Sequence, residues 1–473
     1  MRVETAGYRN RFQTALRNLQ ASRGMRPVDV INGFRMVQPL RSLHVPGESF
    51  DMAHLAMELF TRLQLSYTPC VVPPGRFSVS AVPARSRTAR RRVGLFVDAP
   101  DHLSGVAMTL REWQEQAELA GEELFVHSCG QVVRDGHAVT FPPMGVLSLG
   151  MYEGLALPIP RIDDVMAYVQ RMPFDAIHVS TPGPMGLLGL LAARQRGIPV
   201  CGTYHTDFPR YAGELTGDPG AVELGWRFMR WFYGQLDRVA APTESVKREL
   251  IEHSLDARRL RVVGRGVDTT RFHPGFRDTA WRAAHGPGRS LKLLYVGRLS
   301  REKNLHVLAE AFRRLVPTRP DVALVLVGDG PCRAELERML HGAPATFTGV
   351  LSGEALARAY ASSDLFVFPS KTDTFGRVVL EAQASGLPVI VSDAGGPKDA
   401  MQDGRTGVVV RDLDADSLAR AMDEVTNDPA RMALYRRQAI AFASRQSLAA
   451  SFSAFWNLHR LDETRSPRKE HAL

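Results

Sequence analysis

The feature that most constrains this fold is a repeated alternation of short apolar runs with longer amphipathic segments. The runs of a first series lie at 93–97, 124–126, 176–179 and 200–204, and those of a second series at 291–296, 322–327, 365–368, 389–391 and 407–410. Such runs are typical of buried strands, and strands separated by helices form βαβ units with a parallel sheet. The sequence therefore predicts an α/β protein with two doubly wound, Rossmann-like domains that face each other across a cleft.

The domain boundaries follow from the spacing of these runs. A polar stretch at 274–290 contains Gly and Pro residues and predicts an inter-domain linker. We expect one domain over 93–273 and a second over 291–444, and then, over 445–473, a helix that returns to the first domain and a charged tail. Ligands of doubly wound sheets bind outside the carboxyl ends of the strands, so functional motifs should follow strands.

Residues 1–92 differ from the rest of the chain and are expected to form an extension with a basic linker. A helix is predicted near 50–65, and the segment 83–92 is rich in arginine. Such a run is typical of a solvated connector, and the alternative is an arm that binds phosphate groups of lipid or nucleic acid. The formal charge of +9 favours anionic partners without choosing among them.

Cysteines and apolar segments bear on the cellular compartment. The four cysteines are far apart and form no CxxC pair: Cys70, Cys129, Cys201 and Cys332. This spacing argues against a zinc module or a disulfide framework and fits a reducing cytoplasm. No apolar run follows the N-terminal arginines, and the apolar stretch at 185–193 is too short to span a bilayer. We expect a cytoplasmic protein, with a peripheral position on the inner face of the membrane as the alternative.

Two cations follow the strand predicted at 291–296. Gly297 allows a sharp turn and a close approach of the backbone to a ligand. Arg298 and Lys303 then lie beside the start of a helix near Leu305, where free N–H groups already favour an anion. A diphosphate leaving group needs this kind of charge compensation. The alternative is a pair of surface cations at a helix start.

Two carboxylates follow the strand predicted at 365–368. Asp373 lies in the loop, and Glu381 is expected about two turns into the next helix. The backbone amides of 374–376 would open that helix and face an anion. The carboxylates could accept hydrogen bonds from sugar and ribose hydroxyls. The alternatives are an N-terminal cap with a solvent-facing Glu, or a glycosidase acid–base pair, which this placement fits less well.

The segments 295–304, 327–331 and 370–389 resemble glycosyltransferase family 4, whose members are retaining enzymes with the GT-B fold. The resemblance extends from 93 to 456, and its motifs occur in the family's order. The family has two Glu residues with the spacing of Asp373 and Glu381, so Asp373 departs from the commonest form. The Thr-Asp-Thr-Phe-Gly version resembles GDP-mannose-dependent alpha-mannosyltransferases and related lipid glycosyltransferases.

The resemblance implies roles for residues of the second domain, which would be the nucleotide-sugar donor domain. Arg298 and Lys303 would hold the diphosphate, Asp373 would contact the donor sugar, and Glu381 would bind the ribose. Gly395 and Gly396 would bring the next loop close to the donor. The donor-binding residues implied are Gly105, Gly297, Arg298, Lys303, Thr374, Phe375, Gly376 and Glu381. The catalytic residues implied are His205, Arg298, Lys303 and Asp373.

The first domain would then supply the acceptor side. Gly105 matches the family glycine that lets the loop at 98–106 reach the donor phosphates, and His102 in that loop would face the acceptor. His205 follows a strand, where the family has a His beside the reacting sugar, and a cap or core role is the alternative. Asp207 is a second acceptor-side residue, although an Asp at such a place often only caps a turn. Arg265, in a segment like the family's inter-lobe segment, is equally compatible with a structural role.

These features predict a retaining hexosyltransferase that moves mannose, or as second choice glucose, from a nucleotide-diphosphate sugar to a hydroxyl of a lipid or glycolipid. No metal or cofactor besides the donor substrate is expected, and no nucleic-acid partner, because no binding motif accompanies the mixed aromatic and basic segment 226–233. That segment predicts a core helix, with a helix at a membrane interface as the alternative. The oligomeric state is not predicted. A sugar-nucleotide epimerase of the same architecture and a binding protein without turnover are the rival functions.

Overall fold

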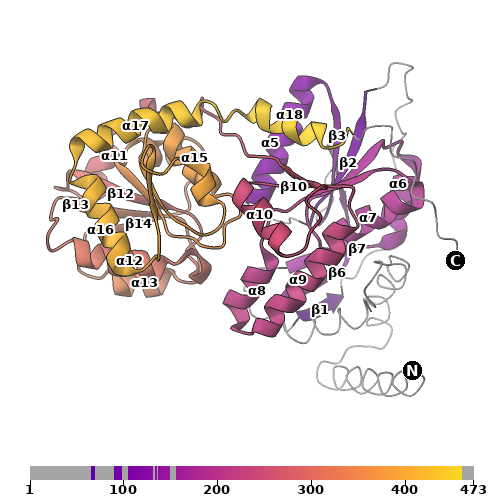
Figure 1. Ribbon diagram of the computed structural model, residues 1–473, viewed down its shortest axis with the longest axis horizontal. Helices are drawn as coiled ribbons and strands as arrows, with labels where there is room; N and C mark the ends of the chain where they lie inside the picture. Colours follow the sequence, from indigo (N-terminus) through magenta and orange to yellow (C-terminus); the bar gives the residue numbers. More distant parts are fainter. Residues whose placement is uncertain are drawn as a thin grey trace.

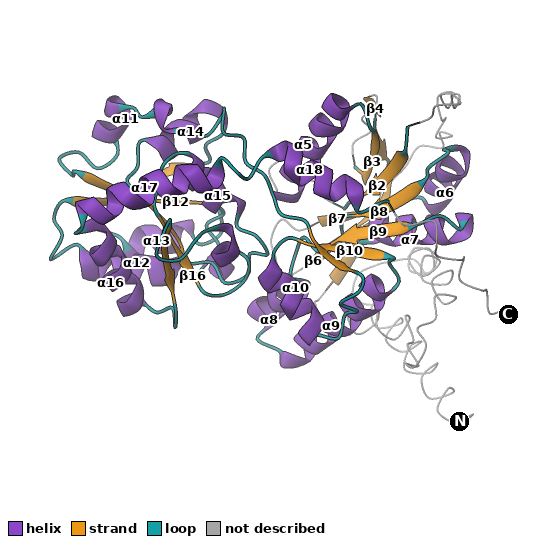
Figure 2. Cartoon of the chain, turned by 45° about the horizontal axis from the view of Figure 1, so that its top comes forward, coloured by secondary structure: helices purple, strands orange, loops and turns teal. Residues whose placement is uncertain are grey.

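The computed structural model describes residues 65–69, 90–98, 105–130, 134–135, 137–149 and 156–460 (Figure 1). The helix predicted near 50–65 lies outside these residues except for Leu65, which begins a strand. Most of the basic run at 83–92 also lies outside them, and Arg92 begins the first strand of the large N-terminal sheet. Two α/β lobes lie side by side, and helices cover both sides of each sheet (Figure 2).

The N-terminal lobe contains an eight-stranded sheet in the order β11-β10-β9-β8-β2-β3-β5-β4, in which only β4 is antiparallel to its neighbour. The strands are β2 (Arg92–Phe96), β3 (Glu123–Cys129), β4 (Arg134–Asp135), β5 (Ala138–Phe141), β8 (Ala176–Val179), β9 (Val200–Thr203), β10 (Arg238–Ala241) and β11 (Leu260–Val262). The helices are α5 (Gly105–Ala120), α6 (Ile162–Arg171), α7 (Pro184–Arg196), α8 (Phe208–Thr216), α9 (Pro219–Gly234) and α10 (Glu244–Glu252). The predicted parallel sheet is confirmed.

A small antiparallel sheet accompanies this lobe and was not predicted. It has the order β1-β6-β7, with β1 (Leu65–Pro69), β6 (Pro143–Leu149) and β7 (Ala156–Pro160). Leu65 pairs with Leu149, so the first described segment joins a strand from the middle of the lobe.

The C-terminal lobe has a six-stranded parallel sheet in the order β14-β13-β12-β15-β16-β17. Its strands are β12 (Leu291–Val296), β13 (Val322–Val327), β14 (Ala345–Gly349), β15 (Leu365–Phe368), β16 (Val389–Ser392) and β17 (Gly407–Val410). Its helices are α11 (Thr279–Ala284), α12 (Leu305–Leu315), α13 (Arg333–Met339), α14 (Gly353–Ala361), α15 (Arg377–Ala384), α16 (Ala415–Thr426) and α17 (Pro429–Ala443). The strand order reverses between β12 and β15, and a doubly wound sheet binds ligands at this switch point.

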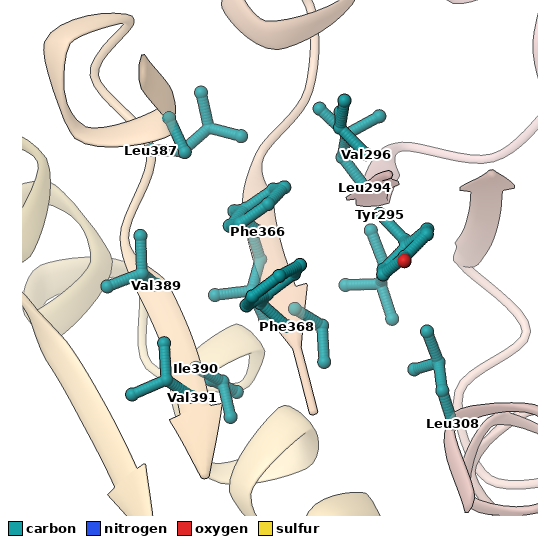
Figure 3. Packing of buried hydrophobic residues seen from close by; sticks show 14 of the residues in the cluster. Leu294, Tyr295, Val296, Leu308, Phe366, Phe368, Leu387, Val389, Ile390 and Val391 are labelled. Carbon is teal, nitrogen blue, oxygen red and sulfur yellow. The ribbon is translucent and has the colours of Figure 1, made fainter. Parts of the chain in front are cut away.

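Side chains of the central strands form the core of this lobe (Figure 3). Phe366 and Ile390 are fully buried, and the rings of Tyr295 and Phe368 stack with centroids 5.9 Å apart. Leu308 of α12 packs against them. Burial of each such apolar side chain contributes about 1.5–3 kcal/mol to the stability of the folded lobe. The packed sheet is therefore a rigid base for the loops that follow β12 and β15.

The end of the described chain returns to the N-terminal lobe. Helix α18 (Leu448–Asn457) packs against α5, where Phe455 stacks on Trp113 with ring centroids 3.8 Å apart (Figure 1). The Ser451 hydroxyl donates to the carbonyl of Gly264 at 2.7 Å, so the returning helix also fixes the segment that leads out of β11.

The approach of this segment to the returning helix leaves no room for a side chain at Gly266. A Cβ atom there would lie 2.6 Å from the backbone of Leu448, whereas a Cβ at Gly264 would have nothing within 4 Å. We expect Gly266→Ala to lower the free energy of unfolding by about 1–3 kcal/mol, and Gly264→Ala to change it much less. Urea unfolding followed by tryptophan fluorescence measures both, and equal midpoints for the two variants would contradict the close contact.

Candidate functional site

The loop after β12 is shaped by two glycines. Gly297 has a φ of 153°, which residues with a side chain rarely adopt. A Cβ on Gly328, in the loop after β13, would lie 1.9 Å from the carbonyl oxygen of Gly297. The short helix η2 (Arg301–Lys303) follows, and Asn304 then leads into α12. Both predicted cations therefore lie before the start of α12, with Arg298 exposed and Lys303 buried.

Lys303 and Asp373 form an ion pair across the switch point. Lys303 Nζ donates to Asp373 Oδ2 at 2.7 Å, so the structure brings together two residues that the sequence singled out separately. Burial alone would lower the pKa of Lys303, but the nearby Asp373 carboxylate and the hydroxyls of Tyr211 and Tyr295 outweigh it and raise this pKa. The ammonium group is therefore charged at neutral pH.

The loops after β15 and β16 lie in backbone contact. Gly376, with a φ of 77°, precedes α15, and the Gly396 N–H donates to the Asp373 carbonyl at 2.8 Å. A Cβ on Gly396 would lie 1.9 Å from the Thr374 carbonyl oxygen, and one on Gly395 would lie 2.5 Å from that of Asp373. The two glycines are thus required by the approach of one loop to the other, and a role toward the donor stays a prediction.

Glu381 is only 3% exposed, which contradicts the solvent-facing alternative. Its Oε2 accepts from the Tyr360 hydroxyl at 3.0 Å, and its Oε1 from Nε of Arg377 at 3.0 Å. The helix begins only at Arg377, because Gly376 is in the left-handed region, so Glu381 is one turn into α15 and not two as predicted.

Arg377 also contacts the N-terminal lobe, and the sequence did not predict this contact. Its Nη1 donates to Oε2 of Glu112 on α5 at 2.6 Å, and its Nη2 pairs with Oε1. Burial would lower the pKa of Arg377, but Glu112 and Glu381 outweigh it and raise this pKa. The spacing of Arg377 and Glu381 could have suggested their pairing, whereas nothing in the sequence points to Glu112.

Other hydrogen bonds join the lobes at the same loops. The Thr374 hydroxyl donates to the carbonyl of His205 at 2.6 Å. Arg210 Nη1 donates to the carbonyl of Lys371 at 2.7 Å. In the short helix η3 (Pro397–Ala400) after β16, the Asp399 carboxylate accepts from the backbone N–H of Ser245 at 2.7 Å and from its hydroxyl at 2.8 Å. The carboxyl ends of the two sheets therefore face each other, with His205 and Thr374 in direct contact.

His205 follows β9 and is neutral. Its Nδ1 lies 2.9 Å from Nη2 of Arg265, and its ring centroid is 6.1 Å from that of Trp113. Burial and then the charge of Arg265 lower the pKa of His205 well below its usual value. Because Arg265 must donate, the ring nitrogen that faces it accepts.

The other site residues predicted from the sequence differ in what the structure shows of them. Asp207 caps α8 and accepts from the backbone N–H of Arg210 at 3.1 Å and from the Tyr204 hydroxyl at 3.2 Å, which supports the capping alternative. Gly105 is the first residue of α5, and no atom of the described residues lies within 4 Å of where its Cβ would be. His102 lies outside the described residues. Phe375 is partly buried against the C-terminal core.

The helix α9 resolves the two interpretations of 226–233. Trp226, Trp231, Phe232 and Tyr233 are buried and Phe228 is partly buried against the same core, which supports a core helix. Within the described part of the chain, no helix has both the length and the apolar character needed to cross a membrane. Among the same residues, no group of three or more His, Cys, Asp or Glu side chains could hold a metal ion.

Each lobe of the chain matches a family model. Residues 103–271 match the family model "Glycosyltransferase Family 4", and 278–443 match "Glycosyl transferases group 1". The chain is 37% identical over 310 residues to a GDP-mannose-dependent alpha-mannosyltransferase of Mycolicibacterium smegmatis, covering 66% of this chain and 76% of the relative. The chain belongs to glycosyltransferase family 4. It is a glycosyltransferase that uses a nucleotide sugar as donor, and these matches do not favour the epimerase.

A second curated protein and two solved structures are also similar to this chain. The sulfoquinovosyl transferase SQD2 of Arabidopsis thaliana is 30% identical over 347 residues, which cover 72% of this chain and 67% of that protein. The crystal structure of Anabaena Alr3699/HepE in complex with UDP and glucose superimposes with a TM-score of 0.62 at 18% identity, covering 79% of this chain and all of that one. A sucrose-phosphate synthase from Thermosynechococcus elongatus gives 0.62 at 22% identity, over 78% and 98% of the two chains. The structural likeness shows the GT-B fold, as predicted.

The pair between Arg377 and Glu112 predicts how the lobes of this glycosyltransferase are held together. Glu112→Gln removes the charge that Arg377 meets on α5, so we expect the lobes to separate more readily and the radius of gyration to increase at unchanged helix content. Glu115→Gln, on an exposed position of the same helix, should leave the radius unchanged. Small-angle X-ray scattering with circular dichroism measures both, and an unchanged radius for Glu112→Gln would show that the pair does not hold the lobes.

Proposed function

We propose that this glycosyltransferase transfers a hexose, with mannose as the first choice and glucose as the second, to an acceptor hydroxyl with retention of the anomeric configuration. The observation that carries the proposal is the ion pair of Lys303 and Asp373 at the switch point, in the loop that leads into the helix with the buried carboxylate of Glu381. GDP-mannose is the preferred donor because relatives from Mycolicibacterium smegmatis and Corynebacterium glutamicum, 37% and 35% identical, are GDP-mannose-dependent alpha-mannosyltransferases.

The diphosphate of the donor would bind between the loops after β12 and β15. Lys303 is a buried cation, and Arg298 adds a second positive charge at the same loop. A buried cation that is already in place stabilises charge more strongly than one in water, because little reorganisation is needed as the leaving group departs. In the free protein Asp373 balances the charge of Lys303, and in the complex Asp373 would turn to the sugar hydroxyls while the diphosphate takes its place.

Glu381 would bind the ribose. A carboxylate offers about four lone-pair positions, and Tyr360 and Arg377 use one on each oxygen of Glu381. The remaining positions can accept from the two ribose hydroxyls. The hydrogen bonds already made hold the carboxylate in one orientation, which reduces the entropy lost when the nucleotide binds.

The reaction would proceed on one face of the sugar. The bond between the anomeric carbon and the diphosphate oxygen breaks, and the acceptor oxygen bonds to the same face of the oxocarbenium-like sugar. The proton of the acceptor hydroxyl passes to the departing phosphate oxygen. His205 has a lowered pKa and is neutral, so it would take part as a hydrogen-bonding group and not as an acid.

A lipid or glycolipid is the proposed acceptor, and the inner face of the membrane the proposed place of work. The support is the Thr-Asp-Thr-Phe-Gly segment at 372–376 and the formal charge of +9, which favours an anionic surface. The Asp207 carboxylate caps α8, so a part in acceptor binding would need its hydrogen bonds to be exchanged.

The test is a donor screen with GDP-mannose, UDP-glucose and UDP-galactose, each with and without mixed membrane lipids. We expect lipid-dependent release of GDP from GDP-mannose, and an alpha-linked product by proton NMR. Lys303→Ala should lower the rate about 10²–10³-fold, the loss typical for one preorganised charge-stabilising group. Lys247→Ala, a surface lysine paired with Glu244, is the control and should retain activity.

Each other result has a defined meaning. If only UDP-glucose is turned over, the transferred sugar is glucose and not mannose. Transfer that does not require lipid would contradict the proposed lipid acceptor. An inverted product, or a Lys303→Ala variant as active as the wild type, would contradict the mechanism. Donor binding with no transfer to any acceptor would favour the rival binding protein without turnover.

A further inference from the structure

Two buried side-chain nitrogen atoms beside the site have no hydrogen-bond partner among the described residues. They are Nε2 of His205 and Nη1 of Arg265. Arg265 is only 6% exposed, so an unpaired N–H of its guanidinium is costly unless another group meets it. The two side chains are in contact, since Nη2 of Arg265 lies 2.9 Å from Nδ1 of His205.

Among the described residues Arg265 has no direct carboxylate partner, and packing holds its side chain in place. The guanidinium carbon lies 5.1 Å from the ring centroid of Trp113, which in turn stacks on Phe455 of α18. Glu112 is near enough to influence Arg265, but its carboxylate is engaged by Arg377. The guanidinium of Arg265 therefore contacts the Trp113 ring and the His205 imidazole and forms no ion pair among the described residues.

The contact with Arg265 determines which nitrogen of His205 carries the proton. A guanidinium has five N–H donors and no acceptor, so Nδ1 of His205 must be the acceptor and carries no hydrogen. Burial and the adjacent charge of Arg265 lower the pKa of His205, so the ring is neutral and its single proton is on Nε2. Burial, followed by the charge of Arg377, lowers the pKa of Arg265 to about 9, which leaves Arg265 protonated at neutral pH.

We propose that Arg265 is a positioning residue that fixes His205 in the Nε2–H tautomer, so that His205 presents a hydrogen-bond donor to an oxygen of the donor sugar. Nε2, the other ring nitrogen of His205, is buried and has no partner among the described residues. The Thr374 hydroxyl binds the His205 carbonyl, which fixes the backbone of His205 at the face where the two lobes meet. The contact between His205 and the donor sugar rests on the proposed function, whereas the tautomer of His205 does not.

The direct test is the tautomer itself. Long-range proton–nitrogen correlation spectra of protein labelled with 15N in histidine distinguish a protonated Nε2 from a protonated Nδ1, and His205→Asn assigns the signals. We expect wild-type His205 to carry its proton on Nε2. Arg265→Lys keeps a donor and should keep this tautomer, whereas Arg265→Met removes the donor and should give a mixture of tautomers. Arg261→Met, at an exposed position of β11, is the control.

A second measurement separates positioning from packing. We expect Arg265→Met to lower the transfer rate about tenfold or more, as for loss of one hydrogen bond to a buried group, and Arg265→Lys to restore most of it. A wild-type proton on Nδ1, a charged imidazolium at neutral pH, or an unchanged tautomer in Arg265→Met would overturn the inference.

The sugar contact is tested by adding GDP-mannose and, separately, GDP to the labelled protein. We expect GDP-mannose to shift the Nε2 signal of His205 further than GDP does. If other histidine signals show that GDP-mannose binds while His205 does not respond, the inference is overturned. A wild-type protein that shows the expected tautomer and transfers no sugar would contradict the proposed function and leave the positioning of His205 by Arg265 intact.

Discussion

The ion pair between Lys303 and Asp373 is the interaction on which the proposed donor site depends. It joins the loops that follow β12 and β15, the two strands between which the order of the C-terminal sheet reverses. Without a counter-charge, burial would lower the pKa of this ammonium, because burial penalises the charged form. Asp373 favours the charged form of Lys303 in the free protein, and in the proposed function it would supply a carboxylate to the sugar once a diphosphate binds.

The same stretch of chain connects the donor site to the other lobe. Between Lys371 and Arg377, three residues make hydrogen bonds to the N-terminal lobe, to Arg210, His205 and Glu112. A change in how the donor binds this loop therefore reaches His205 directly. Closure of two lobes around a bound donor excludes water, which in a transferase protects the donor from hydrolysis.

The sequence predicted the features that local patterns determine. Five of the six strands of the C-terminal sheet could be found because each is a short apolar run, whereas β14 (Ala345–Gly349) was missed because threonines interrupt its apolar residues. Lys303, Asp373 and Glu381 could be singled out because each follows a predicted strand. The antiparallel sheet of β1, β6 and β7 could not be found, because its pairing joins distant segments. Glu112 was missed for the same reason, since 265 positions separate it from Arg377. The contact of Arg265 with His205 also depends on tertiary structure, although both residues had been singled out.

A crystal structure of the protein with bound GDP would show whether Lys303, Asp373 and Glu381 form the donor site. We predict the diphosphate within hydrogen-bond distance of Lys303 Nζ at the switch point, the ribose hydroxyls on Glu381, and Asp373 released from Lys303. A nucleotide bound elsewhere, or a diphosphate at this place while the pair of Lys303 and Asp373 stays intact, would contradict this prediction.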